Sequence, residues 1–143
     1  MLFTEAIGRK VVSTDTASTV GRVRDYIVDP RLPGIVGLTL SKTSGEGGAL
    51  PWSNIIAFGV DAVTVPGAAA VVVPDGYLTE LAAKPHTLLG KRVLSTAGVQ
   101  LGTILDVDFD PAVGRLAWLL LEQAPIDAGR LLGVGSYAVV VRA

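Results

Sequence analysis

Three aspartates at alternating positions have the residue type and spacing of a cation site. Asp106, Asp108 and Asp110 alternate with Val107 and Phe109. In an extended strand, alternate side chains point to the same side, so these carboxylates would share one face. Calcium and magnesium bind several carboxylate oxygens, which makes a metal site one hypothesis for this segment. The alternative is structural, because an aspartate beside a turn commonly accepts hydrogen bonds from backbone N–H groups.

An earlier segment of the chain favours the structural alternative. The stretch VGRVRDYIVDP at residues 20–30 and the stretch LGTILDVDFDP at residues 101–111 share a glycine, two aspartates and a proline in the same order. The matched pairs are Gly21 with Gly102, Asp25 with Asp106, Asp29 with Asp110, and Pro30 with Pro111. Ile27 stands where Asp108 stands, so the third carboxylate is not repeated. We therefore predict that the repeated residues form a strand end and a turn, and we expect no metal ion and no other cofactor.

The other patterns that suggest catalysis or nucleotide binding lack the context that such sites need. His86 is the only histidine and the chain has no cysteine, so we interpret it as a surface residue and not as a zinc ligand. Gly133, Gly135 and Ala138 match a loose dinucleotide fingerprint, but a valine-rich strand follows where a helix is required. The segment KTSGEGG from Lys42 has the wrong order for a phosphate-binding loop. We predict no catalytic residue and no enzymatic activity.

The composition disfavours several classes of protein. Of the 143 residues, 50% are hydrophobic and 17% are charged, which provides enough apolar material for a folded core. The 12 Lys and Arg residues are balanced by 13 Asp and Glu residues, so the chain lacks the positive charge typical of nucleic-acid-binding proteins. No apolar run approaches the roughly 20 residues that span a bilayer. We expect a cytoplasmic protein with no transmembrane segment and no direct nucleic-acid binding, and the absence of cysteine agrees with a reducing compartment.

The elements that position these residues occur twice along the chain. The heptapeptide GRKVVST begins at Gly8 and GKRVLST begins at Gly90, each ahead of the repeated aspartate segment. Farther on, PWSNIIAFGV aligned with PIDAGRLLGV puts Ile126 in place of Trp52 and leaves a two-residue insertion before the last strand. Agreement at so many ordered positions predicts a duplication with a period of about 80 residues.

Each unit reads as short strands separated by turns. Runs rich in valine and isoleucine alternate with Asp-Pro, Pro-Gly and glycine-rich segments, which are signals for strands and turns. Five or six strands in about 60 residues suit a small closed barrel, because closure removes exposed strand edges. We therefore predict an all-β protein of two tandem barrels, at residues 1–66 and 86–143, packed with pseudo-twofold symmetry. An ordered connector at residues 67–85 would hold a possible strand at Val71–Val73 and a short helix that Asp75 caps and that ends before Pro85.

Three motifs in this order resemble the PRC-barrel family. They are G-[RK]-x-V followed by G-x-[VI]-x-D, then D-P-x-x-x-G with a hydrophobic strand, then LPWSNIIAFGVDAVTV. This small β-barrel domain occurs in the H subunit of the purple bacterial photosynthetic reaction centre and in a ribosome maturation factor. The resemblance implies a barrel that serves as a docking surface for another protein and that is not known for catalysis.

The strand after the repeated turn differs most between the two units. In IVGLTL at residues 35–40, strict alternation leaves Ile35 on a small or polar face that can meet water. In LAWLLL both faces are apolar, with Leu116, Trp118 and Leu120 together on one of them. A small barrel has one interior, so the outer face needs cover by the other barrel or the connector, by a second copy, or by another protein. The candidate interface residues are Trp118, Leu116 and Leu120, together with Trp52 and Phe58, for which we prefer a place in the core.

These observations lead to one functional hypothesis and two alternatives. We expect a non-enzymatic adaptor or scaffold that binds a protein partner through its barrel surfaces and self-associates as a homodimer. The first alternative is an RNA-processing or ribosome-associated assembly factor, by analogy with the maturation factor. The second is a module that binds a small molecule or an ion in the cleft between the barrels.

Overall fold

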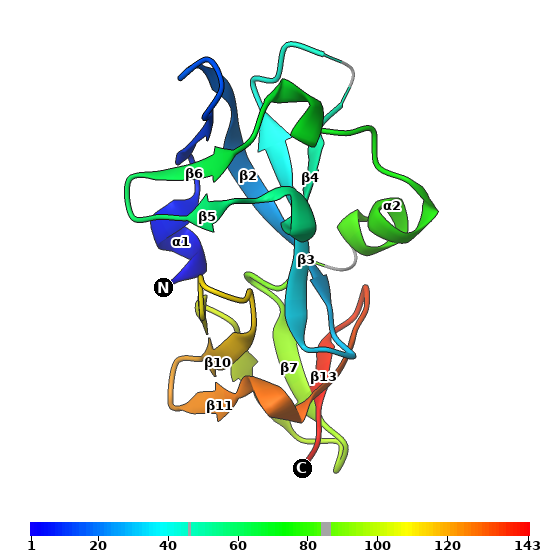
Figure 1. The fold of residues 1–143 in the computed structure, drawn as a ribbon. Coiled ribbons are helices and arrows are strands. Elements are labelled where there is room, and N and C mark those ends of the chain that lie inside the picture. The colour runs from blue at the N-terminus through cyan, green and yellow to red at the C-terminus, as the bar shows by residue number, and fades with distance from the viewer. Residues whose placement is uncertain (46, 84–86) are drawn as a thin grey trace.

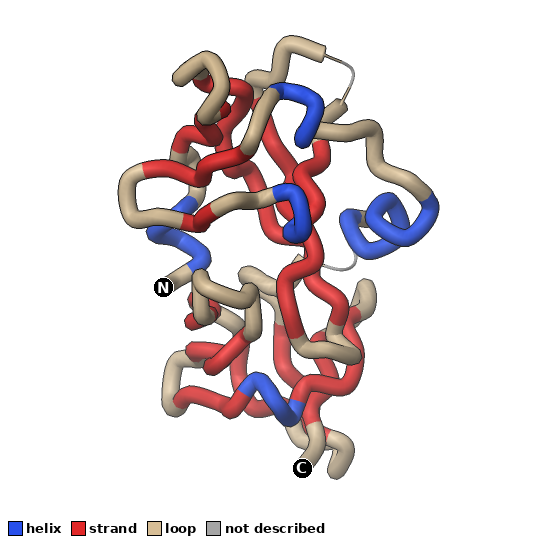
Figure 2. The backbone as a smooth tube through the Cα atoms, in the orientation of Figure 1, coloured by secondary structure: helices blue, strands red, loops and turns tan. Residues whose placement is uncertain are grey.

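The computed structural model describes residues 1–45, 47–83 and 87–143, and strands predominate over short helices (Figure 2). The predicted all-β class is confirmed, with curled sheets of the barrel type. His86 and the predicted boundary between residues 85 and 86 lie outside the described residues, whereas the expected connector helix is present and ends at Ala82, before Pro85.

The first unit is a curled six-stranded sheet that follows a short helix, α1 (Phe3–Ala6). Its elements are β1 (Lys10–Ser13), β2 (Thr19–Asp29), β3 (Gly34–Ser41), β4 (Ala49–Pro51), the 3-10 helix η1 (Trp52–Asn54), β5 (Ala57–Phe58) and β6 (Ala62–Val65). The strand order is β4-β3-β2-β1-β6-β5, in which β1 and β6 pair in parallel and the other neighbours pair antiparallel. The first and last strands of the unit are therefore neighbours.

The second unit has the same order of elements, except that two short strands take the place of β2. They are β7 (Arg92–Ser95), β8 (Gln100–Thr103), β9 (Asp106–Phe109), β10 (Leu116–Leu120), β11 (Pro125–Asp127), the 3-10 helix η4 (Ala128–Arg130), β12 (Leu131–Val134) and β13 (Val139–Val141). Two sheets result, with strand orders β11-β10-β9 and β12-β13-β7-β8, because β8 and β9 share the place of the long β2. As in the first unit, the first and last strands, β7 and β13, pair in parallel.

The strand registers correct one part of the sequence alignment. Leu38 of β3 pairs with Leu50 of β4, and the equivalent Leu119 of β10 pairs with Ile126 of β11. Ile126 therefore corresponds to Leu50 and not to Trp52, and no two-residue insertion is needed. The alignment matched the prolines that begin PWSNIIAFGV and PIDAGRLLGV, which are not equivalent. In a sheet, two residues are equivalent when they pair with equivalent partners on the neighbouring strand, even where their identities differ.

A β-bulge at the same place in both units changes which side chains enter the core. Val36 is the extra residue in β3, and Ala117 is the extra residue in β10. The bulge turns Leu116 to the buried side, away from Trp118, and Ile35 is buried for the same reason. The predicted strict alternation was wrong in both strands, because one inserted residue reverses a period of two.

The connector packs against the first unit (Figure 1). It holds the 3-10 helix η2 (Ala68–Ala70) and the helix α2 (Gly76–Ala82). The carboxylate of Asp75 caps α2 by accepting a hydrogen bond from the N–H of Leu78 at 3.3 Å. In place of the expected strand at Val71–Val73, Val72 forms a single β-bridge with Ala49 on the outer edge of β4. The two backbone hydrogen bonds of this bridge have N to O distances of 3.1 and 2.8 Å.

Reciprocal backbone hydrogen bonds join the two units. The N–H of Ile35 donates to the carbonyl of Gly114 at 2.8 Å, and the N–H of Leu116 donates to the carbonyl of Pro33 at 3.2 Å. The registers make Ile35 equivalent to Leu116, and Pro33 equivalent to Gly114. Each bond is thus the counterpart of the other across a local twofold axis.

An aromatic cluster fills the core across this junction. The ring of Phe109 from β9 lies edge-on to Phe3, Tyr26 and Phe58, at centroid distances of 5.6, 5.6 and 5.4 Å. Phe3 and Tyr26 stack at 3.8 Å, and the Tyr26 hydroxyl donates to the carbonyl of Phe3 at 2.8 Å. Edge-to-face aromatic pairs contribute roughly 0.5–1.5 kcal/mol each beyond the area that they bury. The two units therefore share one hydrophobic core.

Candidate interaction surface

The repeated aspartates bind backbone N–H groups in both units. Asp25 and Asp106 each accept a hydrogen bond from the next residue, at 2.8 and 2.9 Å. Asp29 and Asp110 each accept one from the residue two positions farther on, at 3.0 and 2.9 Å. These bonds hold the strand and the turn that follows it, which is the role expected of an aspartate in an Asx turn.

The repeated glycines and prolines flank these aspartates. Gly21 lies opposite Val11 and Gly102 lies opposite Val93, and in both pairs the register shifts at the next residue. Pro30 and Pro111 begin the turns that lead to β3 and β10. The repeated set is therefore placed at strand pairs and turns.

A basic residue in each unit binds a backbone carbonyl of a distant turn, a role that was not predicted from the sequence. The Arg9 guanidinium donates to the carbonyl of Gly59 at 2.9 Å, and the Lys91 ammonium donates to the carbonyl of Gly135 at 2.5 Å. Both glycines lie in the turn before the last strand of their unit, so Gly135 belongs to a hairpin and not to a nucleotide-binding loop. Burial lowers the pKa of Lys91. The signal was present in the sequence as the basic residue after Gly8 and Gly90.

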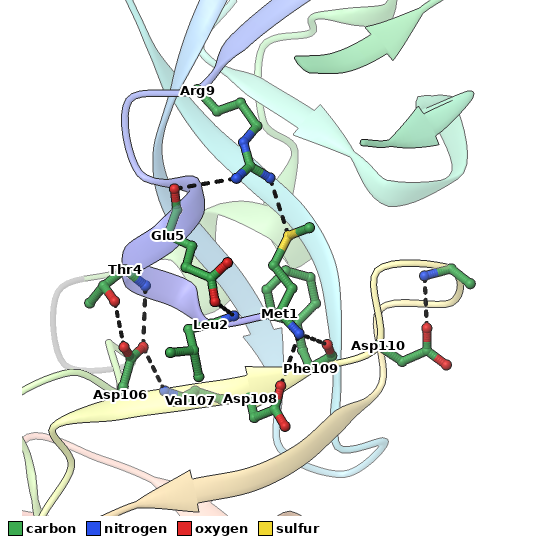
Figure 3. A network of polar contacts seen from close by, with 11 residues as sticks. Met1, Leu2, Thr4, Glu5, Arg9, Asp106, Val107, Asp108, Phe109 and Asp110 are labelled. Atoms are coloured by element: carbon green, nitrogen blue, oxygen red, sulfur yellow. Dashed lines mark hydrogen bonds and ion pairs between the residues drawn. The ribbon is translucent and has the colours of Figure 1, made fainter. Parts of the chain in front are cut away.

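The three alternating aspartates, two in β9 and Asp110 just after it, each have different partners (Figure 3). Asp106 accepts hydrogen bonds from the N–H of Thr4, at 3.2 Å, and from its hydroxyl. Asp108 pairs with the amino group of Met1 at 2.9 Å, and Asp110 remains in its turn. Within residues 1–45, 47–83 and 87–143, no three His, Cys, Asp or Glu side chains gather as metal ligands. The structure brings Asp106 and Asp108, but not Asp110, to the junction with α1.

Asp29 is the one buried carboxylate in the part of the chain that the structure describes. The Arg31 guanidinium donates two hydrogen bonds to it, at 3.2 and 3.0 Å, and the Tyr77 hydroxyl of α2 donates a third at 2.6 Å. The hydrogen bond from Arg31 is the main cause that lowers the pKa of Asp29 to about 2, against the opposing effect of burial. Asp29 thereby anchors the connector helix to the first unit.

The outer face of β9, β10 and β11 presents Trp118, of which 43% is exposed. Directly paired residues of a sheet point to the same side, and the neighbours of Trp118 are Asp108 on β9 and Asp127 on β11. Leu120, half-buried, lies next along this face, opposite Asp106. We call these five residues the acidic tryptophan face. It is the exposed apolar feature that the LAWLLL segment predicts, with an acidic border that the segment does not reveal.

The same face of the first unit differs in both chemistry and cover. Gly37 takes the place of Trp118, and its neighbours are Ile27 and Pro51, so the tryptophan and both of its acidic neighbours are missing, while Asp25, the counterpart of Asp106, is kept opposite Thr39. Helix α2 packs on β2 and β3 there. On the second unit, α1 contacts β9 at the edge of the sheet, and in the described ranges no α-helix makes comparable contact with β10 or β11.

The other predicted interface residues lie elsewhere. Leu116 and Phe58 are buried, at 3% and 6% exposure, so neither belongs to an exposed face. Trp52 is half-buried and stacks on Phe58 at a centroid distance of 5.7 Å. It also packs against Gly114, where an added Cβ would lie 3.0 Å from the indole ring. Phe58 thus occupies the preferred core position, and Trp52 packs at the junction between the units.

Two hollows bear on the small-molecule alternative. One of about 330 Å³ lies between the units, lined by Trp52, Phe58 and Pro111 among others, and no charged side chain lines it. The larger, of about 810 Å³, lies between the first unit and the connector and includes Arg24 and Asp25. Burial raises the pKa of Asp25. The larger hollow is therefore not at the junction where a cleft between barrels was predicted.

One part of the chain matches a known protein family. The curled all-β sheets define the class, and residues 83–136 match the family model of the PRC-barrel domain. The match covers most of the second unit, including Trp118 and Asp127, and confirms the resemblance for that segment. The PRC-barrel domain is in general a protein-interaction module. No curated protein matches the chain, and none of the helices in the described ranges has the length and apolar character needed to cross a membrane.

Proposed function

We propose that the protein is a non-enzymatic adaptor that binds a protein partner through the acidic tryptophan face. The observation that carries the proposal is the exposure of Trp118, which lies between Asp108 and Asp127 on the outer face of β9, β10 and β11. Tryptophan is enriched among the residues that dominate binding energy, because its large ring buries much apolar area at little entropic cost. The PRC-barrel match of residues 83–136 supports the same role.

The acidic border of the face indicates the chemistry of the partner. A guanidinium group can stack on the indole of Trp118 while it pairs with the carboxylate of Asp127, because the carboxylate of Asp108 is already paired with the Met1 amino group. Complementary charge raises the association rate and suppresses wrong partners. We infer a partner that presents arginine or lysine beside an apolar side chain.

The same charges bear on the predicted homodimer. In a twofold dimer built on this face, each copy would present its carboxylates to those of the other copy. Like charges in contact at an interface cost several kcal/mol. The proposal therefore favours a different protein on this face, and self-association stays a prediction for other surfaces.

The non-enzymatic role is supported by the way in which the polar residues are used. Asp25, Asp29, Asp106 and Asp110 bind backbone groups or adjoining side chains that hold turns and helices in place. A cytoplasmic location is part of the proposal, and the lack of cysteine supports it.

Affinity purification with matched variants tests the proposal. We expect the wild-type protein to retain a defined partner from an extract of its native host, and Trp118→Asp to lose it. Tyr137→Asp is the control, because Tyr137 is also an exposed aromatic residue, at 66%, but lies outside the acidic tryptophan face. Elution should begin at moderate salt, since salt screens exposed charges. Equal recovery of the same proteins by all three forms contradicts the proposal.

A further inference from the structure

The open edge of the second unit has a covered counterpart in the first. Along β4 of the first unit, Val72 exchanges two backbone hydrogen bonds with Ala49, and the Asn54 amide donates to the carbonyl of Ala70 at 3.0 Å. Ala70 itself is buried, at 7% exposure. The connector thus adds a short extended segment to the edge of β4 and places a small side chain in the core.

The equivalent place in the second unit is a hollow of about 270 Å³. Its apolar lining includes Leu101, Leu121 and Ile126, and Pro125 and Arg130 lie at its rim. The registers make Pro125 equivalent to Ala49, and Arg130 stands in η4 where Asn54 stands in η1. We call this hollow and its rim the β11 groove. In the described ranges no segment pairs with the free edge of β11.

The charges at the β11 groove differ from those of the first unit. Asn54, an amide that binds the carbonyl of the cover, is replaced by the cation Arg130. Nε of Arg130 donates to the carbonyl of Arg142 at 2.8 Å, and no other partner is found for its guanidinium within the described residues. Arg142 places a second guanidinium nearby, where it donates to the carbonyl of Gly129 at 2.9 Å. The two nearby carboxylates accept hydrogen bonds from other groups. Asp127 accepts one from the N–H of Gly129, and Glu122 accepts two from the N–H and hydroxyl of Thr103.

We propose that the β11 groove binds an extended segment of a partner protein, with alanine or valine side chains facing the hollow and a carboxylate at Arg130. The inference rests on the proposed function as a protein-binding module and adds a second site to it. The connector segment that covers β4 shows how the partner segment would lie along β11. Asn54 binds a backbone carbonyl of the connector, whereas the cation Arg130 at the same place favours a carboxylate of the partner.

Pro125 sets the strength of this contact. Proline has no N–H, so the exchange of two hydrogen bonds seen at Ala49 is reduced to one, in which the carbonyl of Pro125 accepts. A proline on an edge strand also limits unwanted pairing with other strands. The groove therefore suits a partner that binds reversibly through its side chains and its carboxylate.

Peptide titration of the full-length protein tests the inference. The first acetylated peptide, GAAAVVVP, copies residues 67–74, and the second, GADAVVVP, carries aspartate at the place of the exposed Ala69, so that an alanine still faces the hollow. We expect the aspartate peptide to bind at least tenfold more tightly by calorimetry, and to shift amide resonances at Leu101, Ile126 and Arg130 by NMR. Arg130→Asn should remove the tighter binding of the aspartate peptide and leave the affinity for GAAAVVVP unchanged. Arg130→Lys should keep part of the tighter binding of the aspartate peptide.

Three outcomes would overturn the inference. They are no resonance shift at the β11 groove with either peptide, shifts at Ala49 instead, and shifts that depend on protein concentration without peptide, which would assign the groove to a second copy. Trp118→Asp separates the two proposals, because it should abolish partner binding at the acidic tryptophan face and leave peptide binding unchanged. If either partner binding or peptide binding is absent while the other is observed, the absent one identifies the proposal that has failed.

Discussion

At the residue scale, Asp29 shows how one carboxylate can hold a connector in place. Its pKa of about 2 lies below the ordinary value of 3.8, so the stabilisation is fully present above about pH 4 and is lost as the pH falls through 2. A difference of nearly two pKa units corresponds to about 2 kcal/mol. We expect Asp29→Asn to lower the free energy of unfolding by about this amount at pH 7 and by little at pH 2, measured by urea denaturation across that range.

Asp110→Asn is the matched control, because Asp110 is the exposed counterpart of Asp29 and an amide oxygen can also accept the hydrogen bond that its carboxylate accepts from the N–H of Ala112. Its cost should stay below about 1 kcal/mol at every pH. Equal losses for the two variants, or a loss for Asp29→Asn that does not change with pH, would show that the contacts with Arg31 and Tyr77 do not depend on the carboxylate charge.

At the scale of elements, the turn before β10 is fitted to the first unit. Gly114 has a φ of +77°, and an added Cβ would lie 3.0 Å from Trp52 and 3.2 Å from the carbonyl oxygen of Ile35. Gly98, in the turn before β8, has the same φ but nothing within 4 Å of an added Cβ. We expect Gly98→Ala to cost about 1 kcal/mol for backbone strain, and Gly114→Ala to cost a further 1–3 kcal/mol for crowding at the junction.

Thermal and urea unfolding of these two variants separate strain from packing, because the backbone term is common to both. If Gly114→Ala were no more destabilising than Gly98→Ala, the close fit between Trp52 and the β10 turn would contribute nothing to the junction.

At the scale of the whole molecule, the shared aromatic core predicts that the two units unfold together. Trp52 belongs to the first unit, at its junction with the second, and Trp118 lies on the outer face of the second, so Trp118→Phe and Trp52→Phe each leave one tryptophan as a fluorescent reporter. In each variant, the fluorescence midpoint should coincide with the circular dichroism midpoint, as expected for a two-state transition. Phe109→Leu, which removes the central ring of the cluster, should lower the midpoints of both reporters.

Separate midpoints for the two reporters would contradict this prediction. So would a Phe109→Leu variant in which only the Trp118 signal shifts, because Phe109 contacts Phe3, Tyr26 and Phe58 of the first unit.

Part of the candidate surface was predictable from the sequence. The LAWLLL segment indicated an apolar strand that needs cover, and Trp118 is exposed as that argument requires. Leu116 was misplaced because the bulge at Ala117 has no residue signature of its own. The acidic neighbours of Trp118 were not predicted either, since Asp127 meets it only through the pairing of β10 with β11.

The sequence by itself determined the strand content, the repeated order of elements and the turn chemistry. These depend on contacts between residues a few positions apart, such as the bonds that Asp25 and Asp106 accept from the next residue. Only the tertiary structure decided the registers, the bulges, the common core around Phe109 and the cover of β4 by Val72. Those features depend on pairings between distant segments, and several such pairings are compatible with the same local pattern of apolar and polar residues.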